Sequence, residues 1–144
     1  MSDLEVGQVI TAKIRFNNSG LKSSKKHPYL IMNIDKELRI IEIAQLDSLE
    51  GKEYKAAMKS NKVIYCDEPI ETVIDKDSYI QLDNTFLVEL YEDLVKYRRQ
   101  TDKLSKKKLR DVLKSYQSYH LNHHIDENKQ VYMGRKEFES LQNI

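Results

Sequence analysis

The chain has 144 residues, of which 40% are hydrophobic and 33% are charged, and its formal net charge is +1. This length fits one domain of common size, and the composition is typical of a globular protein. Because the net charge is so small, affinity for nucleic acid would have to come from local clusters of cations. The single cysteine, Cys66, excludes an internal disulfide, and we expect it to pack as a small hydrophobe.

No apolar run approaches the ~20 residues that a membrane-spanning helix needs. The first five residues include Asp3 and Glu5 and lack the basic and apolar regions of a secretory signal. We therefore expect a cytoplasmic protein without a membrane partner.

The first two thirds of the chain carry the patterns of short strands. Ile10, Ala12, Ile14 and Phe16 alternate with polar residues, as in a half-buried strand, and the polar stretch 17–26 predicts a loop. The almost continuously apolar run 29–34 is typical of a central strand. Further strands are predicted at 40–46, 62–66, 79–82 and 86–90, with a short helical insert near 50–60.

The last third of the chain is helical in pattern. A short helical turn is expected at 94–99, and Ser105 is expected to cap a stronger helix with Leu109, Val112, Leu113 and Tyr116 on its apolar face. Five or six short strands with tight connections favour a small antiparallel barrel, because closure removes exposed edges. We therefore predict an α+β, mostly β, single domain over 1–144. It has a barrel at 1–92, a helical part at 93–121, and a tail at 122–144 that includes a short helix at 135–141.

A predicted hairpin carries the most informative chemistry. The polar turn Asp35-Lys36-Glu37 separates two apolar strands, so positions whose numbers add up to about 73 should face each other. His27 then lies beside Leu46, Asp47 and Ser48, and directly opposed residues have Cβ atoms about 5 Å apart. An imidazole, a carboxylate and a hydroxyl would meet at one sheet edge.

Cations gather next to this edge. Residues 6–34 contain no acid, and if the first three strands form a meander, their cations share the edge with His27. Such a site can bind a phosphodiester and stabilise charge that develops on it. Alternatively, the lysines only solubilise a loop and His27 is a surface histidine. The residues concerned are Lys13, Arg15, Lys22, Lys25 and Lys26.

Two other groups of residues, one of histidines and one of cations, have spacings that allow a function. His120, His123 and His124 have helical spacing, which allows a metal site but is also common at helix ends. The basic helix face 106–114 is either solvated surface or an RNA contact. The sequence contains no glycine-rich phosphate loop, no Gly-x-Ser-x-Gly elbow, no zinc-finger spacing and no calcium loop, so we expect neither a metal nor another cofactor.

Three stretches in order along the chain resemble the PemK/MazF/Kid superfamily of toxin endoribonucleases. Gly7-Gln8-Val9-Ile10 with Ala12 is similar to the opening Gly-Asp-Val-Tyr strand of that superfamily. The stretch 27–33, which begins His27-Pro28, is similar to its Arg-Pro-Val-hydrophobic strand. The stretch 77–84, Asp-Ser-Tyr-Ile-Gln-Leu-Asp-Asn, is similar to its Asp-Ser-x-Ile-hydrophobic-Leu-Glu-Gln segment. The resemblance covers about residues 5–120.

The resemblance implies a compact SH3-like barrel that closes with a C-terminal helix and usually forms a homodimer. It implies metal-independent cleavage of single-stranded RNA, in which a 2′-hydroxyl attacks its neighbouring phosphate to give a 2′,3′-cyclic phosphate and a 5′-hydroxyl. It also implies a cognate antitoxin, which is a protein in type II systems and an RNA in type III systems. The apolar stretch 86–88 is the local support for a dimer, and it could equally be core.

In this resemblance His27 replaces the catalytic arginine that precedes proline, and the hydroxyl residue at the end of the third strand falls at Asp47 or Ser48. His27 is expected to act as general acid or base, with Asp47 as its partner and Ser48 on the scissile phosphate. The replacement leaves two options, a rewired acid–base pair or a non-catalytic module that binds nucleic acid or protein. The residues expected to contact RNA are Arg15, Asn17, Lys22, Lys25, Lys26 and Gln45.

Overall fold

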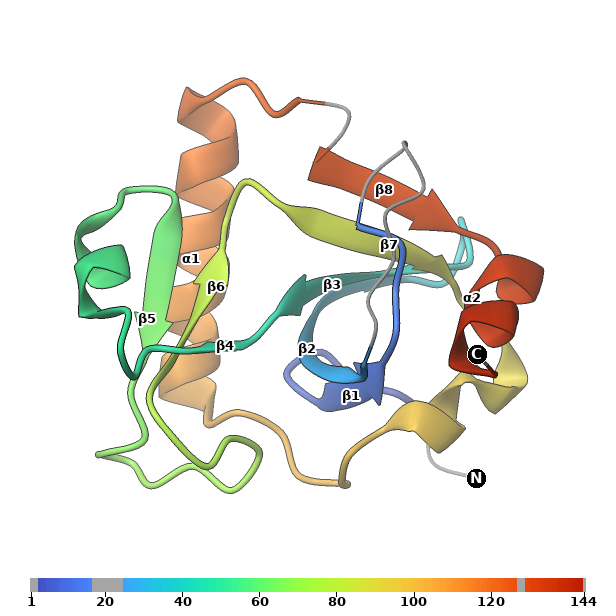
Figure 1. Cartoon of the computed structure of the whole chain (residues 1–144), viewed down its shortest axis with the longest axis horizontal. Coiled ribbons are helices and arrows are strands. Elements are labelled where there is room, and N and C mark those ends of the chain that lie inside the picture. The colour runs from blue at the N-terminus through green and yellow to red at the C-terminus, as the bar shows by residue number, and fades with distance from the viewer. Residues whose placement is uncertain (1–2, 17–24, 127–128, 144) are drawn as a thin grey trace.

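The structure is a computed structural model that describes residues 3–16, 25–126 and 129–143 (Figure 1). Its elements are β1 (Val9–Ala12), β2 (His27–Asp35), β3 (Ile40–Gln45), β4 (Asp47–Ser48), the 3₁₀ helix η1 (Glu53–Ala57), β5 (Asn61–Ile64), β6 (Ser78–Gln81), β7 (Thr85–Glu89), the 3₁₀ helix η2 (Glu92–Tyr97), α1 (Lys106–Asn122), β8 (Gln130–Met133) and α2 (Arg135–Gln142).

The strands form two sheets. One has five strands in the order β1-β2-β3-β7-β8, and the other has three in the order β4-β6-β5. Figure 1 shows α1 across the small sheet at one end of the molecule and α2 at the other end. The predicted α+β class, mostly β with a C-terminal helix, is confirmed. Over the described residues the strand pairings form two separate sheets that do not close into a barrel.

The predicted hairpin and its register are confirmed. Tyr29 pairs with Gln45 and Ile31 with Ile43, so the paired numbers add up to 74 at this end of the ladder. A bulge between Ile31 and Asn33 shifts the register by one toward the turn. Strand β2 lies between β1 and β3, so the first three strands form the expected meander.

Alternation along the strands divides the core in two. Ile10, Tyr29, Ile43 and Phe86 belong to one buried cluster, and Leu30 and Ala44 point to the other face. Phe86 and Val88 are both buried in the first cluster, so the stretch 86–88 packs within the chain.

Helix α1 completes the second cluster. Val112 of α1 packs with Ile64 and Ile80 of the small sheet. The Ser105 hydroxyl accepts a hydrogen bond from the Lys108 amide at 3.4 Å, which confirms the predicted cap. Cys66 lies against the same cluster, half-buried, and burial raises the pKa of its thiol.

The residues after 122 form more structure than the expected tail. Strand β8 pairs in parallel with β7, and the chain segment that joins these two strands contains η2 and α1. The helix predicted at 135–141 is present as α2, and its Phe138 and Leu141 are buried in the first cluster. These side chains cover the apolar face that the five-stranded sheet would otherwise expose.

The insert near 50–60 contains η1, which leaves Tyr54 68% exposed. Among the described residues, no helix combines the length and apolar character needed to cross a membrane.

Candidate nucleic-acid interface

His27 begins β2, where it pairs with Ala12, the last residue of β1. The Leu46 amide donates to the Pro28 carbonyl at 3.0 Å, which continues the β2–β3 ladder beyond Gln45. Among the described residues this hydrogen bond is the last one between the two strands, because His27 pairs with Ala12 and Asp47 pairs with Tyr79 of β6, so the predicted pairing of His27 with Asp47 stays a prediction. His27 is half-buried, so its ring is neither packed into the core nor fully solvated.

Asp47 leaves the hairpin at this point. It pairs with Tyr79 of β6, and Ser48 pairs with Ser78. The Gln45 side-chain amide donates to Asp47 Oδ1 at 2.9 Å, which fixes the carboxylate at the same end of the sheet. Among the described interactions there is no hydrogen bond from the His27 ring to Asp47 or Ser48. We call this end, with His27, Gln45, Asp47 and Ser48, the rim.

Tyr29 adds an unexpected feature beside the rim. It faces Gln45 in the ladder and is 0% exposed, and its hydroxyl has no hydrogen-bond partner among the described residues. Burial raises the pKa of the Tyr29 phenol, and the nearby Asp47 carboxylate raises it further. The phenol is therefore a neutral donor at neutral pH. Sequence reasoning assigned Tyr29 to the core and did not identify this hydroxyl.

Arg15 has a different partner from the expected RNA. Its guanidinium forms an ion pair with Glu137 of α2 at 2.5 Å and donates to the Tyr132 carbonyl at 2.8 Å. The arginine side chain is only 17% exposed. Its charge is therefore balanced within the chain, by a residue 122 positions away that no local pattern could indicate.

Of the remaining residues expected to contact RNA, two lysines are described by the structure and two residues are not. Lys25 and Lys26 are exposed directly before His27. Asn17 and Lys22 lie outside the described residues. The rim therefore has two exposed cations next to its imidazole.

The histidines near the end of α1 have local partners. His120 Nε2 lies 2.7 Å from the Leu82 carbonyl, and the His123 ring stacks on Tyr119 with centroids 4.0 Å apart. His124 is exposed. Over the described part of the chain, no three histidine, cysteine or carboxylate side chains gather in a way that could hold a metal ion.

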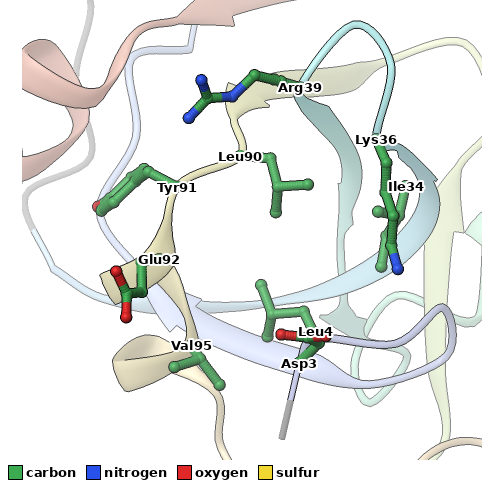
Figure 2. A pocket seen from close by; sticks show the side chains of 9 residues that line it. All are labelled: Asp3, Leu4, Ile34, Lys36, Arg39, Leu90, Tyr91, Glu92 and Val95. Carbon is green, nitrogen blue, oxygen red and sulfur yellow. The ribbon is translucent and has the colours of Figure 1, made fainter. Parts of the chain in front are cut away.

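A pocket of about 390 Å³ lies at the other end of the hairpin (Figure 2). Leu4, Leu90 and Val95 contribute apolar side chains to it. Lys36 and Arg39 line it together with Asp3 and Glu92, so its charges balance. It therefore offers no net attraction to a polyanion, and it lies away from the rim.

Comparison with protein families finds none that matches the chain, and comparison with curated proteins finds no detectable relative.

Proposed function

We propose that this chain is the toxin of a toxin–antitoxin system and a metal-independent endoribonuclease of the PemK/MazF/Kid type that cleaves single-stranded RNA. The observation that carries the proposal is the register at the rim. The hydrogen bond from the Leu46 amide to the Pro28 carbonyl joins the residue that follows His27 to the residue that precedes Asp47, next to two exposed lysines, and this supports an imidazole and a carboxylate close together. An acid–base pair beside positive charge is what transesterification of a phosphodiester requires.

In the proposed reaction the 2′-hydroxyl oxygen forms a bond to the neighbouring phosphorus while the bond from phosphorus to the 5′-oxygen breaks. His27 takes the proton of the 2′-hydroxyl and then gives it to the leaving 5′-oxygen, since an imidazole is suited to both transfers near neutral pH. Asp47 orients the ring, and Ser48 donates to the phosphate. Lys25 and Lys26 balance the charge of the phosphorane. Arg15 contributes less to this role, because its guanidinium already forms an ion pair with Glu137.

The SH3-like barrel is part of the same proposal. It is supported by the continuation of β3 into β4, through which one segment serves both sheets, as strands do at the corners of barrels and orthogonal sandwiches. A homodimer and an antitoxin that covers the rim complete the proposed system.

A variant of the imidazole tests the proposal. We expect His27→Ala to lower the rate of RNA cleavage by about 10²–10⁴-fold, the usual value of one proton-transfer group, and to abolish growth arrest on expression in bacteria. Circular dichroism and thermal unfolding should be unchanged, because the ring is half-buried and makes no described hydrogen bond. His124→Ala, which removes an exposed histidine, is the matched control. Equal cleavage by the two variants would reject the assignment.

The second candidate is a non-catalytic module that binds nucleic acid. It is favoured by one observation, that the His27 ring makes no described hydrogen bond to Asp47 or Ser48. A chain of this kind would bind RNA without cleaving it and would be tolerated on expression, so the same growth assay separates the two functions.

A further inference from the structure

A groove of about 450 Å³ separates α1 from the small sheet, on a part of the molecule that contains no rim residue. One wall is a single face of α1, on which positions 114, 118 and 122 form one row at helical spacing and positions 115 and 119 form another, and His123 follows directly after the end of the helix. Lys59, Asn61 and Lys62 form the other wall, and Leu82 adds to the lining. The complete lining is Lys59, Asn61, Lys62, Leu82, Lys114, Ser115, Ser118, Tyr119, Asn122 and His123.

The charge of this groove is entirely positive. Lys59, Lys62 and Lys114 line it, and no carboxylate does. None of the ion pairs formed by the described residues involves these three lysines. Lys108 on the neighbouring face of α1 differs, because Asp67 and Glu71 lie 3.7 and 3.8 Å from its ammonium. The groove lysines are therefore available to an anionic ligand.

The positive charge continues along α1. A row of three cations at intervals of four positions, Lys106, Arg110 and Lys114, lines a shallow depression next to the groove. At 1.5 Å per residue these cations cover about 12 Å, which is the length of three to four stacked nucleotides at about 3.4 Å each. Lys114 belongs both to this row of cations and to the lining of the groove. A linear polyanion fits this arrangement better than a single phosphate does.

The groove also has an aromatic platform. The exposed His123 ring lies nearly parallel to the Tyr119 ring, with an interplanar angle of 10°. The backbone at Leu82 is held on both sides, because its amide donates to the Ser60 carbonyl at 2.6 Å and its carbonyl lies 2.7 Å from His120 Nε2. Planar rings beside a row of cations are the usual means of binding single-stranded nucleic acid, since every base has a face that can stack.

We infer that this groove binds single-stranded RNA at a site separate from the rim, with Lys59, Lys62 and Lys114 on phosphates and the Tyr119–His123 pair stacked on a base. The identity of the polymer rests on the proposed function, but binding here needs no cleavage. Strands β4 and β5 are the two edges of the small sheet, with β6 between them, so the groove wall lies about 10 Å from the strand that carries Asp47.

The test measures binding of a fluorescent 12-nucleotide RNA by anisotropy at several salt concentrations, with every variant made in the His27→Ala background. Using this background keeps the RNA intact, and it makes failure of binding distinct from failure of cleavage. We expect the triple variant Lys59→Gln, Lys62→Gln, Lys114→Gln to bind at least about tenfold more weakly near 0.1 M salt. The slope of log affinity against log salt should fall by about 2, because each lost phosphate contact removes about 0.7. The control is Lys36→Gln, Lys76→Gln, Lys136→Gln, which removes equal charge outside the groove and should bind as the parent does.

The aromatic platform is tested separately. His123→Ala should weaken binding by about fivefold or more through lost stacking, while His124→Ala, its exposed neighbour, should have no effect. The inference is overturned if the groove triple variant binds with the affinity and salt slope of the control triple. It is also overturned if a polyglutamate peptide of equal charge binds as tightly as the RNA does.

Discussion

At the scale of single residues, the buried tyrosines show how the same side chain has different consequences in different surroundings. The buried Tyr29 hydroxyl has no hydrogen-bond partner in the described part of the chain, whereas the Tyr116 hydroxyl donates to the Glu42 carboxylate, which also accepts from Thr85 at 2.6 Å. Burial and the Glu42 carboxylate together raise the pKa of Tyr116. Glu42 is only 9% exposed, and these donors supply hydrogen bonds to its buried carboxylate.

Removal of these two hydroxyls should therefore have different effects on the free energy of unfolding. Tyr29→Phe deletes an unsatisfied polar group and should leave the free energy of unfolding unchanged or raise it by up to about 1 kcal/mol. Tyr116→Phe removes a donor from a buried carboxylate and should lower that free energy by about 1–3 kcal/mol. Urea denaturation of the two variants measures both changes. A loss greater than about 1 kcal/mol in Tyr29→Phe would mean that the hydroxyl has a partner after all.

At the scale of elements, α2 is attached to η2 by a carboxylate. Glu139 accepts a hydrogen bond from the Tyr97 hydroxyl, and the Lys96 ammonium lies 3.1 Å away. Partial burial raises the pKa of Glu139, but the hydrogen bonds from Tyr97 and Lys96 outweigh this effect, so the net pKa is lowered. A carboxyl with a lowered folded-state pKa stabilises the fold above its unfolded-state pKa, and this contribution is lost as the pH falls through the folded-state value.

Acid unfolding should therefore depend on Glu139. The wild-type chain is expected to lose stability steeply below about pH 4, the ordinary range of a glutamate, and Glu139→Gln should be less stable at pH 7 but lose less on acidification. Thermal unfolding at a series of pH values gives both quantities. Glu37→Gln, at an exposed position of the hairpin turn, should show the wild-type pH profile. Identical profiles for the two variants would contradict the role given to Glu139.

At the scale of the whole molecule, local patterns predicted elements better than their assembly. The hairpin register follows from a turn between two apolar strands, and the start of α1 follows from a serine before a periodic apolar face, so both were predictable. The division of the strands into two sheets was not predictable, because alternation identifies a strand without indicating which edge it pairs with. The parallel pairing of β8 with β7 joins segments that are separated by the whole of α1.

In the candidate site too, the sequence predicts what depends on local pairing and does not predict what depends on distant contacts. The hairpin that brings the chain near His27 back toward Asp47 is local, and the sequence predicts its register. The ion pair of Arg15 with Glu137 and the groove between β5 and α1 depend on distant contacts, and the sequence therefore indicates only their charges. Positive charge alone does not show whether a cation is paired within the chain or open to a ligand.

The most direct test of the account is to map the ends that the purified chain leaves on single-stranded RNA in the presence of EDTA. We expect cleavage to proceed without a divalent metal and to leave a 2′,3′-cyclic phosphate on one product and a 5′-hydroxyl on the other. RNA that stays intact, or cleavage that needs added metal and leaves a 5′-phosphate, would contradict the proposal that His27 and Asp47 form an acid–base pair for attack by the 2′-hydroxyl.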